Sequence, residues 1–522
     1  MSDIFKYGID QLTVASAIDI AAGRVKGILV PEVITRVQTS FGYVQTIVAQ
    51  HTTVYGINTG FGPLCDTKIS EEDTRALQYN ILQSHSVGVG ENIPEEIARI
   101  MLITKVQALA QGYSGVALST LERIIWHIEH GITPLVPEKG SVGASGDLAP
   151  LSHLFLPLIG LGHVMYRGRK TDTASMMQQE GIQPVVLGPK EGLALINGTQ
   201  FILSFAVKAV QRLYNALEAA DIIGALSLEG LMGTAKPFDP RLHVIRPYPG
   251  NQLVAHRLKT LLDNSEIMSS HVDCGRVQDP YSLRCMPQVH GASRTAWQHL
   301  RELTTIELNA VTDNPIIFSA EDTISGGNFH GQPLALPLDY ATVAAAELGN
   351  ISDRRCYMMI EGRYGLPKLL IQDAGLNSGF MIPQYTTAAL VTENKTLCFP
   401  ASADSVPTSL GQEDHVSMGS ISGRKLNQVI SNLEYILAIE LLYAAQAVDF
   451  RRPLKSGPVL EAVHQYTRRH VSFADKDRIF SNDIAALHHI ITDQSLVRVA
   501  NEAAANHQLN LNGLYNDQFG LY

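Results

Sequence analysis

RKLNQVISNLEYILAIELLYAAQAVDF, residues 424–450, is the stretch of sequence that decides the fold class. Apolar residues recur in it at steps of three and four, the spacing that places them on one face of an α-helix: Leu426, Val429, Ile430, Leu433, Ile436, Leu437 and Leu441. At about 1.5 Å per residue this helix is roughly 40 Å long, and helices of that length bury their apolar faces in a bundle, within one chain or between subunits. Pro453 ends the run.

Two other stretches, residues 201–232 and 334–363, resemble this one because they are rich in Ala, Leu and Ile and contain few helix breakers. Residues 1–200 differ, with many Gly and Pro residues, and segments 55–64 and 138–150 are typical of loops. We therefore expect a mainly α protein with three parts: a loop-rich N-terminal region (1–200), a long central helical bundle (201–455) and a C-terminal helical segment (456–522).

Composition excludes several classes of protein. The chain has 522 residues, of which 45% are hydrophobic and only 17% charged, and this predicts that some surface is buried between subunits. The net charge of −10 and the lack of a basic block argue against a nucleic-acid partner. Five cysteines without a CxxC pair indicate reduced thiols rather than disulfides or zinc. No segment is long and apolar enough for a membrane, and no leader is evident, so we expect a cytoplasmic protein.

The loop at residues 140–153 contains the tripeptide Ala144-Ser145-Gly146. It has an ordinary interpretation, a turn in which Ser145 or Asp147 caps the following helix. It does not match the G-x-S-x-G elbow of hydrolases. Its small residues also permit cyclisation: the Gly146 nitrogen attacks the Ala144 carbonyl, and loss of two waters, one from Ser145, leaves an alkene conjugated with a five-membered ring. Both interpretations are compatible with composition alone.

Six segments in the same order resemble the histidine/phenylalanine ammonia-lyase family, and the resemblance continues through the C-terminal half. They are VYGINTGFG (54–62), GASGDL (143–148), LALINGT (193–199), QDPYSLR (278–284), TDNP (312–315) and GGNFH (326–330). The resemblance implies a helical lyase architecture of the fumarase/aspartase type and a homotetramer whose active sites are shared between subunits. It also implies that Ala144, Ser145 and Gly146 form 4-methylideneimidazole-5-one (MIO), with no external cofactor.

The resemblance assigns roles to further residues. Elimination of ammonia from an α-amino acid needs an electrophile that takes up the amine and a base that removes the β-proton. Ser145 contributes the electrophilic alkene, and Tyr55 is the base, although its pKa near ~10 must fall for work at neutral pH. Arg284 offers a bidentate fork for the substrate carboxylate. The other residues implied in catalysis or substrate binding are Tyr281, Asn197, Gln278, Asn314 and Phe329.

Two places indicate which amino acid is the substrate. Ser84-His85 stands where histidine enzymes of the family have Ser-His, and Glu413 lies in a segment, EDHVSM, that is similar to theirs. A carboxylate there can bind an imidazole N–H, whereas it would be desolvated without a partner against a benzene ring. We therefore expect elimination of ammonia from L-histidine to give trans-urocanate. Many relatives have a polar residue at the position of Gly411, so one contact that supports the site is in doubt.

Rival functions remain open at this point. The same scaffold serves tyrosine and phenylalanine ammonia-lyases, and aminomutases that add the ammonia back. The fumarase/aspartase enzymes themselves are disfavoured because their G-S-S-x-M-P-x-K loop is missing. A metal enzyme would need a ligand cluster, and the nearest histidine pairs, His127/His130 and His488/His489, are expected on solvated helix faces. A catalytically dead scaffold would have lost Ser145 or Tyr55, and both are present.

Overall fold

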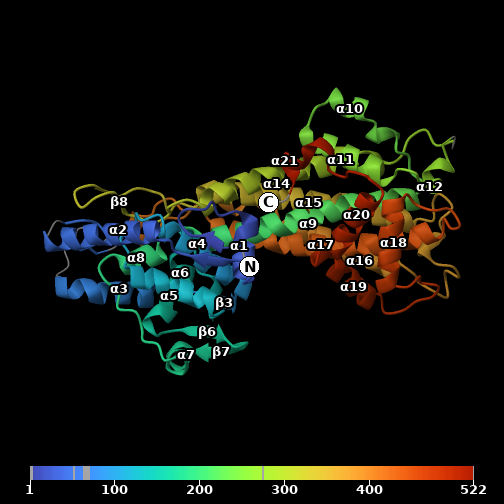
Figure 1. The fold of residues 1–522 in the computed structure, drawn as a ribbon. Helices are drawn as coiled ribbons and strands as arrows, with labels where there is room; N and C mark the ends of the chain where they lie inside the picture. The colour runs from blue at the N-terminus through green and yellow to red at the C-terminus, as the bar shows by residue number, and fades with distance from the viewer. Residues whose placement is uncertain (1–3, 51–52, 61, 63–70, 273–274, 521) are drawn as a thin grey trace.

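Four long helices form the centre of the molecule. The computed structural model describes residues 4–50, 53–60, 62, 71–272, 275–520 and 522. The central helices are α9 (Gln200–Gly230), α14 (Met286–Leu308), α15 (Gln332–Ile360) and α17 (Gly419–Asp449). Helix α17 packs against both α9 and α15, and α14 packs against α9 and α15. Figure 1 shows these helices crossing the middle of the molecule and joining two lobes. The predicted helical bundle is confirmed.

The predicted long helix begins earlier than the sequence pattern suggests. Helix α17 has 31 residues and starts at Gly419 rather than near 424, so it is about 46 Å long. Its first turn contains small residues without an apolar stripe. The turn packs closely against α9, because a Cβ added to Gly419 or Gly423 would lie only 2.9 Å from an α9 side chain. Tertiary contact therefore extends the helix beyond its amphipathic segment.

The N-terminal lobe surrounds one end of the bundle with short helices and small sheets. Its helices are α1 (Val14–Ala21), α2 (Pro31–Ala49), α3 (Glu71–His85), α4 (Glu95–Leu109), α5 (Leu118–Glu129), α6 (Leu148–Phe155), α7 (Thr173–Glu180) and α8 (Glu191–Ile196). Its strands form a parallel pair, β1 (Ile4–Lys6) with β2 (Lys26–Ile28), an antiparallel pair, β3 (Val89–Asn92) with β5 (Pro137–Lys139), and an antiparallel sheet in the order β4 (Thr133–Pro134), β6 (His163–Tyr166), β7 (Arg169–Asp172).

The opposite lobe collects short helices from the middle of the chain and from its C-terminal part. They are α10 (Pro240–Val244), α11 (Pro249–Leu261), α12 (Glu266–Ser269), α13 (Tyr281–Arg284), α16 (Met381–Leu397), α18 (Pro458–His470), α19 (Phe480–Thr492), α20 (Ser495–Asn506) and α21 (Asn516–Phe519). The antiparallel pair β8 (Ile316–Ile317) and β9 (Thr323–Ile324) follows α14 and lies in the N-terminal lobe. One hydrophobic cluster runs from Phe5 to Phe519 and connects both lobes.

The direction of the long helices positions the functional residues. Helices α9, α15 and α17 begin close together, since a Cβ on Gly331 or Gly419 would contact Ile202 at 2.6–2.9 Å. Helix α14 runs the other way, because α12 precedes it in the C-terminal lobe and β8 follows it in the N-terminal lobe (Figure 1). Three N-termini therefore meet at one end of the bundle, where their peptide dipoles create a positive potential.

One expectation about the histidine pairs is wrong. His127 is 2% exposed, because it continues the apolar face formed by Leu121 and Ile124 on α5. Burial lowers the pKa of His127 to about 4. His488 is stacked on Tyr435. Among the described residues, no group of three or more His, Cys, Asp or Glu side chains is arranged to hold a metal ion. Nor does any described helix combine the length and the apolar character that a membrane crossing demands.

Candidate active site

The Ala144-Ser145-Gly146 tripeptide lies in a tight loop pressed against the start of α9. Gly143 and Gly146 have φ of 72° and 74°, values that a side chain strongly disfavours. Gly146 pairs with Gly198 in a parallel β-bridge, and the Asp147 N–H donates to the Gly198 carbonyl at 2.8 Å. A Cβ on Gly146 would lie 2.1 Å from that carbonyl oxygen. The third position of the tripeptide therefore has to be glycine.

Ser145 is held from two sides. Its carbonyl oxygen accepts a hydrogen bond from Asn197 Nδ2 at 2.7 Å, and its hydroxyl donates to Glu413 Oε1 at 2.6 Å. The second carboxylate oxygen of Glu413 accepts from the Thr408 and Ser409 hydroxyls at 2.9 and 2.7 Å. The predicted ring-forming serine and the predicted specificity carboxylate are thus in direct contact, although 268 residues separate them in the sequence.

Two buried ionisable groups support this loop. The Asp147 carboxylate accepts from the Ile202 N–H and the Ser141 hydroxyl, and burial raises its pKa to about 7 against the effect of these bonds. The Lys105 ammonium donates to the Asn197 carbonyl at 2.7 Å, and burial lowers its pKa to about 7. Asp147 was expected from the sequence only as a helix cap; it is the N-cap residue of α6, but its side chain bonds Ile202 of α9 instead of the first turn of α6. Lys105 was missed, because an isolated Lys inside an apolar helix gives no local motif.

A cavity of about 940 Å³ opens in front of Ser145. Eight of the predicted site residues line it: Tyr55, Ser84, His85, Ser145, Asn197, Asn314, Phe329 and Glu413. Ala144 and Gly146 flank Ser145 in the chain. Apolar side chains, among them Leu77, Ile81 and Leu193, form the rest of the wall together with polar groups. The cavity is large enough for an amino acid.

One face of α3 supplies part of the cavity wall. Leu77, Asn80, Ile81, Ser84 and His85 all line the cavity and follow the spacing of a single helical face. Only the last two were predicted, yet the same period would have found the others. The Ser84 hydroxyl and His85 Nδ1 are 2.9 Å apart. Burial lowers the pKa of His85, and the negative charge of Glu413 acts in the opposite direction.

The remaining lining residues come from three loops. The N–H of Gly62 donates to the Tyr55 hydroxyl at 3.3 Å. Asn314 bonds the loop after β9, because its amide donates to the Ser325 hydroxyl at 3.0 Å and its carbonyl accepts from the Gly326 N–H at 2.7 Å. Gly411, which does not line the cavity, is exposed with φ of 87°, and a Cβ there would meet nothing within 4 Å.

Three predicted residues, Gln278, Tyr281 and Arg284, lie elsewhere. They precede the first residue of α14, whereas Asn314 follows its last. A helix of 23 residues spans about 35 Å, so one chain cannot bring Arg284 into the cavity that Asn314 lines. The Tyr281 side chain is 71% exposed, and the Arg284 guanidinium lies over its ring at 4.6 Å. We call residues 278–284 the arm.

The model of the aromatic amino acid lyase family matches residues 12–469. The chain belongs to the aromatic amino acid lyase family. A histidine ammonia-lyase of Sorangium cellulosum is 50% identical over 458 residues, which are 86% of this chain and 89% of that protein. The family members of known structure include a histidine ammonia-lyase from Trypanosoma cruzi, with a TM-score of 0.90, 37% identity and coverage of 99% and 98% of the two chains.

Another family member, a tyrosine aminomutase from Streptomyces globisporus, has the same TM-score of 0.90 at 35% identity, with coverage of 96% of this chain and 98% of the other. The likeness extends over essentially the whole fold in both structures. The helical lyase architecture expected from the sequence is therefore confirmed, while the shape of the fold alone does not separate a lyase from a mutase.

Proposed function

We propose that this chain is a histidine ammonia-lyase, which removes ammonia from L-histidine without oxidation and releases trans-urocanate. The observation that carries the proposal is the contact between Ser145 and Glu413 in a cavity that His85 also lines. It places a serine suited to ring formation beside two groups suited to an imidazole. The high identity to a histidine ammonia-lyase over most of the chain supports the same substrate.

We propose that the electrophile is MIO, made from Ala144, Ser145 and Gly146. The Gly146 nitrogen forms a bond to the Ala144 carbonyl carbon, whose oxygen leaves as water; Ser145 then loses its hydroxyl and α-hydrogen as a second water. The fit is supported by the absence of space for a Cβ at Gly146 and by the Asn197 bond to the Ser145 carbonyl. When formed, the group supplies an electrophile that takes up the substrate amine and makes it a better leaving group.

The lining residues divide the remaining work. Tyr55 removes the β-proton as general base. Glu413 accepts a hydrogen bond from an imidazole N–H or stabilises its charge, and Ser84 and His85 of α3 also bind the ring. Asn197, Asn314 and Phe329 orient the substrate in the cavity. The positive ends of α9, α15 and α17 favour negative charge that develops at this end of the bundle.

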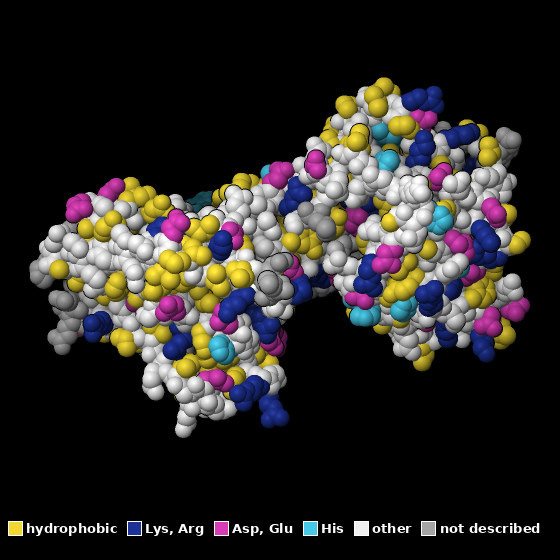
Figure 2. All heavy atoms as spheres, viewed as in Figure 1, with side chains coloured by type: hydrophobic (Ala, Val, Ile, Leu, Met, Phe, Trp, Pro, Cys, Tyr) yellow, Lys and Arg dark blue, Asp and Glu magenta, His cyan; other side chains and the backbone are white. Residues whose placement is uncertain are grey.

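We also propose that a neighbouring copy completes the site with Gln278, Tyr281 and Arg284, and that the assembly is a homotetramer. The length of α14 supports this, because Arg284 and Asn314 lie at its opposite ends. Apolar side chains remain exposed along one face of α15, namely Leu336, Tyr340, Val343 and Tyr357, each about half exposed. Figure 2 shows further apolar side chains gathered on the surface. We expect these faces to be covered by other subunits.

We also propose a cytoplasmic location and a three-part division of the chain. Reduced thiols support a cytoplasmic location: Cys285, Cys356 and Cys398 are free, and the other two cysteines, Cys65 and Cys274, lie outside the described residues. The proposed parts are an MIO-bearing region (1–200), a central bundle (201–455) and a C-terminal segment (456–522). They differ in their roles rather than in having separate cores, since one hydrophobic cluster connects them.

The test is direct. The purified chain should have an intact mass two waters below the value calculated from its sequence, and it should release ammonia and a conjugated acid from histidine. A full-length mass without the deficit would refute MIO. The same assay with tyrosine and phenylalanine separates the alternative, a tyrosine or phenylalanine ammonia-lyase or aminomutase, which the tyrosine aminomutase fold keeps open. Turnover of tyrosine equal to that of histidine, or formation of a β-amino acid, would favour that alternative.

A further inference from the structure

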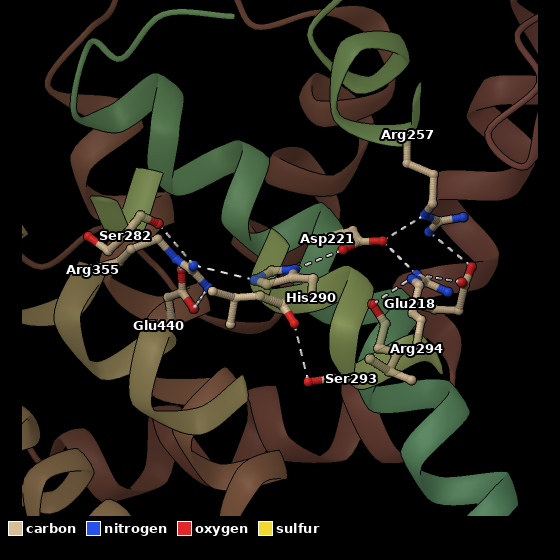
Figure 3. Close-up of polar contacts among 11 residues, drawn as sticks. Glu218, Asp221, Arg257, Ser282, His290, Ser293, Arg294, Arg355 and Glu440 are labelled. Atoms are coloured by element: carbon tan, nitrogen blue, oxygen red, sulfur yellow. Dashed lines mark hydrogen bonds and ion pairs between the residues drawn. The ribbon is translucent and has the colours of Figure 1, made fainter. Parts of the chain in front are cut away.

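A continuous line of buried polar side chains crosses the bundle below the arm (Figure 3). Asp221 of α9 accepts from Arg257 Nε at 2.9 Å and from His290 Nδ1 at 2.8 Å, and it also pairs with Arg294. Because Nδ1 of His290 carries this proton, its Nε2 is an acceptor, and it faces Arg355 Nη1 at 3.5 Å. Burial lowers the pKa of His290, which keeps the ring neutral between the carboxylate and the guanidinium.

Arg355 of α15 is oriented by Glu440 of α17. Its Nε and Nη2 donate to the two carboxylate oxygens of Glu440 at 2.5 and 2.9 Å. The same carboxylate accepts from the hydroxyls of Ser227 and Ser352 at 2.7 and 2.5 Å. Glu440 is thereby saturated with donors, and the bidentate pair fixes the plane of the guanidinium. The remaining nitrogen of Arg355, Nη1, is the one that faces the arm.

The line ends on the backbone of the arm. Arg355 Nη1 donates to the Ser282 carbonyl at 3.3 Å. Ser282 lies between Tyr281 and Arg284 in α13, which has four residues and is too short to be rigid by itself. The Leu283 side chain is fully buried, whereas Tyr281 is exposed. The Leu283 side chain and the Ser282 carbonyl therefore attach α13 to the interior, while the Tyr281 side chain projects from it and the half-buried Arg284 lies over the Tyr281 ring.

The two halves of this line differ in what they touch. The half with Glu218, Arg257 and Arg294 joins α9, α11 and α14 through fully buried ion pairs. Within the described residues, no hydrogen bond or ion pair of these three side chains reaches the arm directly. The half with His290, Arg355 and Glu440 reaches Ser282. A substitution in the first half leaves the bond between Arg355 and the Ser282 carbonyl in place and tests stability, and the same substitution in the second half tests the arm as well.

We propose that Arg355, oriented by Glu440 and His290, is a positioning residue for the substrate carboxylate: it fixes the Ser282 carbonyl and with it the direction in which Tyr281 and Arg284 enter the neighbouring copy's cavity. The inference rests on the proposed function and adds a residue that touches neither substrate nor the reacting atoms. Its loss weakens carboxylate binding in the ground state and the transition state alike, so KM rises more than kcat falls.

The first experiment compares two equivalent substitutions. Arg355→Lys keeps the charge that Glu440 needs, but one ammonium cannot replace the fork that serves both Glu440 and Ser282. We expect KM for histidine to rise about tenfold or more, as for a displaced binding group, with the two-water mass deficit and the tetramer retained. Arg257→Lys, equally buried, is the matched control: it lowers the melting temperature and leaves KM unchanged. An unchanged KM in Arg355→Lys, or an equal rise in both variants, overturns the inference.

His290→Asn provides an independent variant if Arg355→Lys does not fold. The asparagine amide keeps a donor for Asp221 and removes the acceptor that faces Arg355. We expect a smaller rise in KM, about threefold, because Glu440 still holds the guanidinium. A wild-type KM in this variant, measured on protein with a normal mass deficit, counts against the inference in the same way.

The second experiment locates the defect. Chains with Arg355→Lys retain Ser145, and chains with Ser145→Ala retain an intact arm. In co-assembled tetramers, some sites combine Ser145 from an Arg355→Lys chain with the intact arm from a Ser145→Ala chain. These mixed sites should have the wild-type KM. Arg284→Ala in place of Arg355→Lys is the control for sharing. A raised KM at every mixed site, or failure of the Arg284→Ala pair to complement, overturns the inference.

The two proposals fail in different ways. If the unsubstituted chain lacks the mass deficit and does not act on histidine, the proposed function is wrong. If the unsubstituted chain acts on histidine but Arg355→Lys behaves like Arg257→Lys, only the positioning role is wrong.

Discussion

The two ends of the helical bundle are built on opposite plans. At the cavity end, three helices begin together, and polar groups such as Ser145, Glu413 and His85 surround a hollow of about 940 Å³. At the arm end, the interior contains buried ion pairs, and of the residues predicted to bind substrate there, Tyr281 is exposed and the half-buried Arg284 lies over its ring. The predicted reactive groups at one end thus surround an open cavity, while the predicted binding groups at the other end are supported by buried ion pairs. The contrast underlies the proposal that residues from more than one copy complete the site.

The largest expected effect tests the cavity end alone. Ser145→Ala removes the hydroxyl whose loss creates the alkene, so we expect activity to fall by about 10³-fold or more and the two-water deficit to disappear, with an unchanged helical circular dichroism spectrum. Ser409→Ala, which removes a hydroxyl from the other oxygen of Glu413, should keep the deficit. Intact mass and ammonia release check both variants. Retained activity in Ser145→Ala would remove the basis of the proposed chemistry.

The next effect tests whether the two ends meet between chains. Arg284→Ala should raise KM for histidine by about 10²-fold, on the order of 3 kcal/mol for a lost bidentate carboxylate pair, and should leave the mass deficit intact. Co-assembly with Ser145→Ala chains should recover activity, since each chain supplies what the other lacks. Arg363→Ala is a control, because Arg363 pairs with Glu361 outside the arm. A normal KM in Arg284→Ala would separate the arm from the reaction.

A smaller effect sharpens the substrate side of the cavity end. Glu413→Gln keeps an oxygen that can accept from Ser145, so the two-water deficit should persist, while kcat/KM for histidine falls about 10- to 100-fold because the charge facing the imidazole is lost. Loss of that charge also removes the influence that raises the pKa of His85, so His85 should titrate at lower pH. Kinetics with histidine and tyrosine check the variant; an equal loss for both substrates would contradict a role in specificity.

The smallest effect concerns the support of the reactive loop. The pKa of Lys105 is lowered from 10.5 to about 7, so between pH 7 and 10.5 the unfolded chain binds more protons than the folded one, and stability contributed by this group increases with pH. Lys105→Met should remove that increase. Asp147, whose pKa is raised from 3.8 to about 7, acts in a separate window, where stability falls as pH rises. Melting temperatures of both proteins from pH 7 to 10 check the sign; parallel curves would contradict it.

Sequence patterns predicted the helices and loops better than the arrangement of these elements in space. The period of residues 424–450 gave helix α17 in all but its first turns, and the loop motifs identified Ser145, Tyr55 and Asn197. The period could not show that α14 runs against α9, α15 and α17, because a helical repeat is the same in either direction. The separation of Arg284 from Asn314 follows only from that direction.

Other features of the site could not be predicted from the sequence, for a different physical reason. Lys105 and Asp147 act through burial, and burial depends on which helices surround them, a property of the packed chain. The contact of Ser145 with Glu413 joins segments 268 residues apart, a distance at which no local pattern carries information. By contrast, Leu77 and Asn80 could have been predicted as lining residues, because they lie on the same helical face as Ser84 and His85.

The close approach of Gly146 to Gly198 has a consequence for the history of each molecule. The proposed cyclisation joins atoms of a loop that is pressed against the start of α9, so we expect the ring to form only after these two segments have folded together. We therefore expect the proposed two-water deficit, a covalent change, to mark a chain that has reached the native state at least once. The fraction of chains carrying the mark would persist through later unfolding, and a mass spectrum of a denatured sample would still count the molecules that were once correctly folded.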